Sequence, residues 1–277
     1  MTDNRFEPVN KAHAIVEMVL FFEFVPSLSA NNIQRLLALR SELEEDLPSS
    51  DVLTSVQVLL SDQGVKQEAK TGGIELRRFK PDGSLEWLIR ISETSVSIHC
   101  LEYTRWESVW SKVNDYADKV FSKLSGANVT ISKIGLKYVD QFMFHGDMKT
   151  YDVTPLLKQD SPLLHPHAFR SGSQWHCHTG WFEDAEALGQ VLSQLNVDST
   201  MASIQGNQHI VVVIDQTFTR HAMSEGELAS YSVPTIVGLE TRSRLVNWMH
   251  EANKRLLCEL LTDSVRNRIR LYTEKTL

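Results

Sequence analysis

The sequence predicts an α+β fold in which two tandem βαβββα-like units, residues 1–127 and 128–277, build a curved antiparallel sheet with long helices packed on one face. Three observations support this prediction. Two similar strand patterns open the two halves of the chain, hairpin signals follow each of them, and a long amphipathic helix pattern closes each half. Antiparallel hairpins with helices on one face are typical of α+β folds. The two units are expected to pack as one globular body.

The two opening strands carry the alternation of apolar and polar residues that is typical of a strand with one buried face. In the second of them, residues 131–144, Leu136 and Tyr138 alternate with Lys137. The first, residues 13–25, has Glu23 on its polar face and the following residues on its apolar face: Val16, Met18, Leu20, Phe22 and Phe24. Because one pattern opens both halves, we interpret the chain as an internal duplication.

The first half continues with a helix over residues 30–45, for which Ser29 is the expected N-cap. Its apolar residues recur at helical spacing and form one buried stripe. Residues 49–72 predict a short strand, 56–60, within polar loop. The first half therefore places one helix between its opening strand and the hairpin that follows.

That hairpin consists of strands 74–79 and 85–91, joined by the turn Lys80-Pro81-Asp82-Gly83. Proline presets the turn and glycine supplies a positive φ. After a third strand, 95–101, Thr104 and Glu107 predict a capping box for the long helix of this half, which is expected to end at Gly126.

The second half predicts a short helix over 153–158 and strands over 174–182, 187–196 and 209–218, with a helix as the alternative for 187–196. Residues 219–240 are expected to form a long loop, and loops of that length are commonly functional or disordered. A short tail helix with Thr262 as its cap is expected at the end. The closing helix before it places its apolar residues on one face: Leu245, Trp248, Met249, Ala252, Leu256 and Leu260.

The composition is typical of a soluble globular protein, with 42% hydrophobic and 23% charged residues in a chain of 277. A net charge of -7 does not favour a nucleic-acid partner, because duplex binding relies on a basic surface. Cys100, Cys177 and Cys258 are widely spaced and predict neither a disulfide framework nor a zinc site. No signal sequence or membrane-spanning run is recognisable, so a cytoplasmic location without a membrane partner is expected.

Three segments carry a resemblance to a known family: AIVEMVLFFEFVP from Ala14, KIGLKYVDQF from Lys133 and WMHEANKRLL from Trp248. Together they resemble a sporadically distributed prokaryotic family of uncharacterised proteins of about this length, with an Ile-Val-Glu strand near the N-terminus and an Arg-Ile-Gly-Leu-Arg-Tyr strand in mid-chain. Here lysines replace both arginines, and Ala14 stands where the family has proline. The resemblance spans nearly the whole chain and implies no assigned reaction. The patchy distribution of the family implies an accessory component of a defence or toxin–antitoxin system.

Four histidines are candidate metal ligands: His165, His167, His176 and His178. The first two lie in a loop, whereas the last two are spaced to share one face of a strand, where paired imidazoles can hold a metal. A third ligand would come from the loop histidines or from Asp184. The alternative is that these histidines are ordinary surface or hydrogen-bonded residues.

Tyr138, Asp140 and Asp215 are the candidate ligand-binding residues of a concave sheet face. Each of the two acids stands at the polar end of an apolar strand, and together with Glu23 they could form a carboxylate group for catalysis. The alternative is that they solvate a sheet edge or cap a turn.

A basic stretch near the C-terminus contains the candidate patch Arg266, Arg268 and Arg270. Such a patch would suit RNA, DNA or an acidic partner. The alternative is a solvated helix whose C-terminal cations complement the helix dipole.

The leading hypothesis is a non-enzymatic, regulatory or binding protein without a cofactor, because the chain offers a scaffold but no Gly-x-Ser-x-Gly elbow and no phosphate-binding loop. Its expected partner is a small molecule or a protein, and a homodimer is one option. The alternatives are a metal-dependent hydrolase that uses the histidine cluster and an accessory component of a prokaryotic defence or toxin–antitoxin system.

Overall fold

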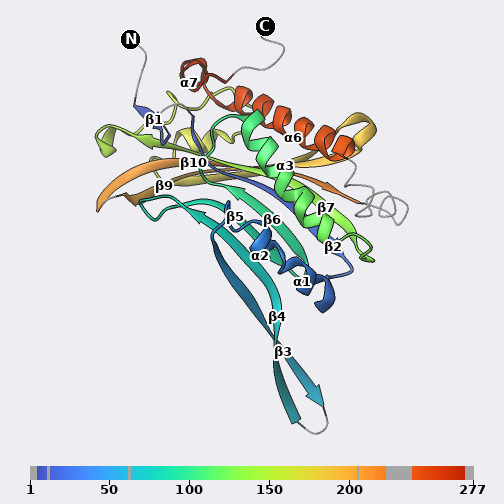
Figure 1. The fold of residues 1–277 in the computed structure, drawn as a ribbon. Coiled ribbons are helices and arrows are strands. Elements are labelled where there is room, and N and C mark those ends of the chain that lie inside the picture. Colours follow the sequence, from blue (N-terminus) through green and yellow to red (C-terminus); the bar gives the residue numbers. More distant parts are fainter. Residues whose placement is uncertain (1–4, 11–12, 62–63, 205, 223–238, 272–277) are drawn as a thin grey trace. The chain divides into compact units, whose positions relative to one another are not determined.

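The computed structural model describes residues 5–10, 13–61, 64–204, 206–222 and 239–271. The described residues form an antiparallel sheet of ten strands, and the chain is 44% strand and 28% helix (Figure 1). The predicted fold of long helices packed on a curved sheet is therefore wrong, because the sheet dominates. The physical reason is that several segments without clear alternation pair as long strands.

Contacts divide the chain into two compact units, and neither of them is continuous in sequence. The first unit consists of Met1–Met18, Leu136–Arg220 and Ser243–Leu277, and the second consists of Val19–Gly135 and His221–Arg242. The internal duplication of residues 1–127 and 128–277 stays a prediction.

In the second unit, hydrogen bonds link the strands in the order β3-β4-β5-β6-β2. Their bounds are β2 Ile15–Val25, β3 Ser49–Ser61, β4 Gly64–Phe79, β5 Leu85–Ser92 and β6 Ser95–Cys100. β3 and β4 pair along their whole length and extend past β5 as a two-stranded ribbon (Figure 1). The predicted short strand 56–60 is thus the last part of a longer strand.

The helices of the second unit are α1 Ala30–Leu36, α2 Leu39–Glu42 and α3 Trp106–Lys123. The Ser29 N-cap is confirmed, because its side chain accepts a hydrogen bond of 3.2 Å from the Asn32 amide. The single predicted helix 30–45 is wrong, since it breaks between α1 and α2. The predicted capping box is also wrong, because Thr104 contacts the Ser108 hydroxyl at 3.1 Å and α3 begins one residue later than a Thr104 cap requires.

Aromatic packing fixes α3 to the strands of this unit. The Phe121 ring packs edge to face on Phe22, with 4.9 Å between ring centroids. Gly135 lies against Phe21 so closely that a Cβ atom at this position would be 2.0 Å from the ring. A side chain at position 135 would therefore displace that ring.

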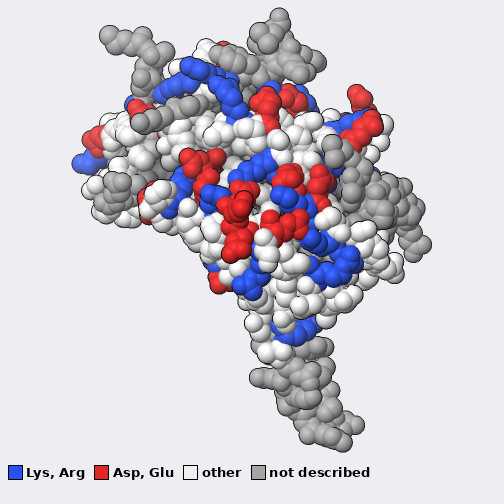
Figure 2. Space-filling view, viewed as in Figure 1, with Lys and Arg blue, Asp and Glu red and all other residues white. Residues whose placement is uncertain are grey.

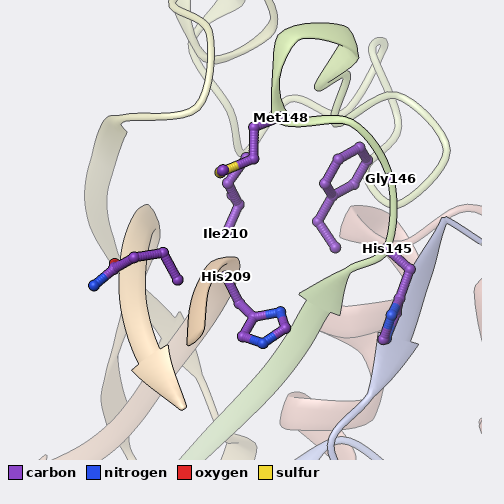
Figure 3. A pocket seen from close by; sticks show the side chains of 7 residues that line it. His145, Gly146, Met148, His209 and Ile210 are labelled. Atoms are coloured by element: carbon purple, nitrogen blue, oxygen red, sulfur yellow. The ribbon is translucent and has the colours of Figure 1, made fainter. Parts of the chain in front are cut away.

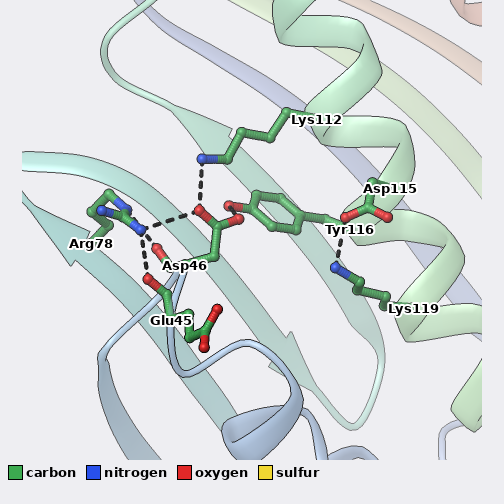
Figure 4. A network of polar contacts seen from close by, with 7 residues as sticks. All are labelled: Glu45, Asp46, Arg78, Lys112, Asp115, Tyr116 and Lys119. Carbon is green, nitrogen blue, oxygen red and sulfur yellow. Dashed lines mark hydrogen bonds and ion pairs between the residues drawn. The ribbon is translucent and has the colours of Figure 1, made fainter.

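A polar network joins Asp46, which follows α2, to β4 and α3 (Figure 4). The Asp46 carboxylate accepts hydrogen bonds from Tyr116 Oη at 2.5 Å, Lys112 Nζ at 3.0 Å and Arg78 Nη2 at 3.2 Å. Burial raises the pKa of Asp46, but the hydrogen bonds from Tyr116 and Lys112 outweigh this effect, so the pKa is lowered. These bonds connect three segments that are distant in sequence.

Figure 2 shows Lys and Arg intermixed with Asp and Glu on the face where α3 lies. Lys119 binds Asp115 at 2.7 Å, and Lys123 pairs with Glu42. The Arg242 side chain is fully buried, and its guanidinium donates to Asn114 and Asp118 of α3, each at 2.6 Å.

In the first unit the strands run in the order β7-β10-β9-β8, and β1 also pairs with β7. Their bounds are β1 Phe6–Pro8, β7 Thr130–Phe144, β8 Trp175–Asp184, β9 Gln190–Ile204 and β10 Asn207–His221. The predicted strands 174–182 and 209–218 are confirmed. Strand β9 begins later and runs further than the predicted 187–196.

The described helices of the first unit are α6 Leu239–Leu260, which belongs to this unit from Ser243 onward, and α7 Asp263–Arg268. Three short 3-10 helices are η1 Met148–Thr150, η2 Pro166–Phe169 and η3 Glu186–Leu188. Most of the predicted loop 219–240 lies outside the described residues, although β10 extends to His221. None of the described helices is long and apolar enough to cross a membrane.

The predicted tail helix with Thr262 at its N-cap position is confirmed, whereas the predicted helix 153–158 is wrong. Residues 153–158 form turns and not a helix, because Leu157 pairs with Leu261 instead of continuing helical hydrogen bonding. Thr262 does occupy the N-cap position of α7, but its hydroxyl donates to the Pro155 carbonyl at 2.8 Å and makes no cap hydrogen bond. Leu157 and Thr262 thus connect residues 155–157 to residues 261–262, which are distant in sequence.

Candidate functional site

Two of the sequence-predicted ligand residues lie on the buried face of β7, in the first unit. The Tyr138 side chain is fully buried, and its hydroxyl shares a hydrogen bond of 2.8 Å with Nδ1 of His250 on α6. Burial, with a smaller contribution from the Lys254 charge, lowers the pKa of His250 to about 3. The imidazole is therefore neutral at physiological pH.

Asp140 lies two residues further along the same face and is 2% exposed. It accepts a hydrogen bond of 3.3 Å from Nε2 of Gln216 on β10. Burial raises the pKa of Asp140 to about 7, although the Gln216 hydrogen bond opposes the shift. The Gln216 Oε1 atom is buried and has no hydrogen-bond partner among the described residues. This carboxyl group therefore titrates near neutral pH but is closed off from solvent.

The third predicted ligand residue, Asp215, is not brought together with Tyr138 and Asp140. It neighbours Gln216 on β10, so its side chain points to the opposite face of the sheet. There it forms an ion pair of 2.6 Å with Lys137. In the second unit, Glu23 is paired with Lys133 at 2.7 Å. Each predicted acid thus has its own partner, and Asp140 and Asp215 do not share a face.

The four candidate metal ligands form two separate pairs of exposed side chains. His165 and His167 stack at 4.9 Å between ring centroids, and His176 and His178 lie 5.1 Å apart on β8. An acid near the second pair is Asp198, whose carboxylate is 3.8 Å from His178 Nε2. Among the described residues, no group of three or more His, Cys, Asp and Glu side chains is arranged to hold a metal ion.

The candidate basic patch is largely engaged in contacts within the first unit. Arg266 binds Asp263 at 2.8 Å, and the Arg268 guanidinium donates to the Phe6 carbonyl oxygen of β1. Arg270 follows the end of α7 and is exposed, with a φ of 55°. Of these arginines, Arg268 therefore links α7 to β1, and Arg266 pairs within α7.

The structure contains a hollow that the sequence did not predict, which we name the β7–β10 cavity (Figure 3). It has a volume of about 280 Å³ and lies where β7 ends, η1 begins and β10 starts. Its lining residues are Phe144, His145, Gly146, Met148, Gln208, His209 and Ile210.

The cavity combines apolar and polar groups. Phe144 and Ile210 are buried at 3% and 1% exposure, whereas Met148 is 51% exposed. The His145 side chain lies beside β1, apart from Met148, Ile210 and His209 (Figure 3). There His145 Nε2 lies 3.4 Å from Glu7 Oε2. Gln208 and His209 are polar residues of the lining that have no such contact with β1.

An aromatic cluster supports this cavity. Phe144 packs on Phe6 and on Tyr151, with 5.2 Å between ring centroids in each case. Tyr151 is held in turn by a hydrogen bond of 2.8 Å to the Ser199 hydroxyl. A Cβ atom at Gly146 would lie 2.9 Å from the Phe144 ring, so the chain can pass this ring only without a side chain. The only sequence signal for the site is the His145-Gly146-Asp147 turn after an apolar strand.

No protein-family model matches this sequence, and no curated protein matches it either. Among solved structures, the chain is similar to the crystal structure of the di-domain ARO/CYC StfQ from the steffimycin biosynthetic pathway. The identity is 10%, the TM-score is 0.14, and the comparison covers 86% of this chain and 96% of that chain. A likeness of this size supports no conclusion about fold or function.

Proposed function

We propose that this chain is a non-enzymatic binding protein that holds a small, flat molecule in the β7–β10 cavity. The observation that carries the proposal is the cavity of about 280 Å³, which joins buried apolar groups to an imidazole and an amide. Ligand sites are typically apolar hollows with a few polar groups that orient the ligand.

The volume indicates the size of the ligand. An engineered apolar cavity of about 150 Å³ binds benzene. A space of about 280 Å³ therefore suits a molecule about twice as large, such as two fused rings. The Phe144 and Ile210 side chains would contact the rings, and His209 or Gln208 would hydrogen-bond a polar substituent. Met148 is flexible enough to adapt to the shape of the bound molecule.

The burial of the polar cluster around Tyr138 supports binding over catalysis. Catalytic acids and bases must reach a substrate. Tyr138 and Asp140 are 0% and 2% exposed, and His250 contacts Tyr138 within the same buried layer. These groups are therefore placed to stabilise the first unit and not to meet a substrate.

The proposal is tested by titrating the protein with indole as a two-ring probe and following the chemical shifts of isotope-labelled methionine methyl groups. Binding at the cavity is expected to shift the Met148 signal in a saturable way. Calorimetric titration measures indole binding in variants that lack the Met148 methyl group. Met148→Trp is expected to weaken this binding at least tenfold, because the larger side chain occupies the cavity. An unchanged Met148 signal at saturating indole would contradict the proposal.

Two matched controls separate binding from general damage. Met148→Leu keeps a similar volume and is expected to retain indole binding. His209→Ala removes the imidazole that faces the cavity and is expected to weaken binding, whereas His176→Ala on exposed β8 is expected to leave it unchanged. Equal effects of the two histidine variants would exclude a role for the cavity.

A further inference from the structure

Strand β8 is the last strand of the sheet in the first unit. It pairs with β9 along all 10 of its residues, from Trp175 opposite Ser199 to Asp184 opposite Gln190, without a register shift. No described strand pairs with its other edge. In a regular strand every second residue directs its backbone N–H and C=O to that edge. β8 therefore presents a row of groups that can pair with a further strand.

This strand lacks three of the features by which natural proteins protect sheet edges, namely lysine, proline and β-bulges. Its sequence, WHCHTGWFED, contains no lysine, arginine or proline. Phe182 is 59% exposed, and both Thr179 and Gly180 at the strand centre are exposed. An edge of this kind is expected to have a partner in solution.

The side chains of β8 are complementary to a second, antiparallel copy of the same strand. Residues opposite each other in an antiparallel pair lie on the same face of the sheet. If Gly180 pairs with its own copy, His176 stands opposite Asp184 and His178 stands opposite Phe182. All of these residues are on the exposed face of β8. This register places an imidazole opposite a carboxylate twice and covers both Phe182 rings.

We infer that a second copy of this chain pairs with β8 in this register and extends the sheet across a two-fold axis at Gly180. Such an interface uses one patch twice, as closed dimers of identical chains do. The pairing satisfies the outer backbone groups of β8, and each His176 imidazole can donate a hydrogen bond to the Asp184 carboxylate opposite it. The inference does not depend on the β7–β10 cavity, which lies on other residues.

The test is sedimentation equilibrium of the whole chain at micromolar concentrations. The wild-type protein is expected to form a dimer, and Phe182→Lys is expected to weaken the dimer roughly tenfold or more, because it replaces a covered apolar ring with a charge that the interface would desolvate. Phe79→Lys is the matched control, since Phe79 is 46% exposed on β4, outside the proposed interface. A monomeric wild-type protein, or equal weakening by both variants, would overturn the inference.

A charge exchange tests the register. His176→Asp places two acids opposite each other and is expected to weaken the dimer, whereas the double variant His176→Asp/Asp184→His is expected to restore it. Circular dichroism of each variant shows whether the chain is folded. If the double variant dimerises no better than the single one, the proposed register is wrong.

Discussion

The Tyr138 hydroxyl lies 2.8 Å from His250 Nδ1. Tyr138 stands two residues before the buried Asp140 on the same face of β7. The two ionisable groups of this layer have opposite linkage to folding. Burial raises the pKa of Asp140 to about 7 and lowers that of His250 to about 3. Between about pH 4 and pH 6.5, the folded state holds the Asp140 proton more tightly than the unfolded state does, and it holds the His250 proton less tightly. Their effects on stability therefore oppose each other.

Asp140→Asn is expected to remove the Asp140 contribution to the pH dependence of stability. Because the pKa of Asp140 is raised in the folded state, the free energy of unfolding of the wild-type protein falls as the pH rises from about 4 to about 7. Asparagine does not titrate, so the variant lacks this contribution. The free energy of unfolding of the variant relative to wild type should therefore rise over this range, by up to about 4 kcal/mol. Urea unfolding at a series of pH values measures the difference. Asp215→Asn is the control at the opposite sheet face, and a pH-independent difference for Asp140→Asn would contradict a buried, titrating carboxyl.

Tyr138→Phe is expected to lower the free energy of unfolding by about 1–2 kcal/mol, because it removes a buried hydrogen bond to His250. The same measurement on His250→Phe and on the double variant gives the coupling energy of the pair. A coupling energy near zero would show that the 2.8 Å contact does not stabilise the folded state.

Asp46→Ala is expected to destabilise the second unit by about 1–3 kcal/mol, because it leaves the buried Tyr116 hydroxyl without this acceptor. Asp46→Asn keeps an acceptor oxygen and should cost less. Since the folded pKa of Asp46 is lowered, its stabilising effect is present above about pH 4 and is lost as the pH falls through the folded value. Thermal unfolding of both variants at neutral and acidic pH checks the order. Equal losses for the two variants would contradict the hydrogen-bond explanation.

Gly135→Ala is expected to cost about 1–3 kcal/mol, because its Cβ would overlap the Phe21 ring. Removing that ring should relieve the overlap, so Phe21→Ala is expected to cost less in the Gly135→Ala background than in wild type. Urea unfolding of the two single variants and the double variant gives this comparison. Additive losses would show that the ring is not the obstacle.

Local sequence signals correctly predicted the elements that depend on residues close in sequence. The alternation of β7, the Ser29 cap and the Gly83 turn all depend on residues close in sequence, and Gly83 has the expected positive φ of 83°. Residues 49–72 were misjudged because Thr54, Ser55 and Gln57 weaken the alternation. Those residues are strand because β3 pairs with β4, a tertiary effect that overrides local preference.

The candidate site was predicted only in part for a similar reason. Alternation correctly places Tyr138 and Asp140 on one face, but it cannot show that α6 covers that face. The β7–β10 cavity joins His145 and Met148 to His209 from a distant part of the chain. The residues that follow β7 carry no information about which other strand begins next to them in the folded chain.

The discontinuous composition of the units has a consequence for protein synthesis. The first unit needs Met1–Met18 and Ser243–Leu277 together, so its earliest residues leave the ribosome long before their final neighbours exist. The second unit can gather most of its residues, Val19–Gly135, much earlier. The nascent chain is therefore expected to keep the buried face of β7 in contact with chaperones until the C-terminal helices emerge.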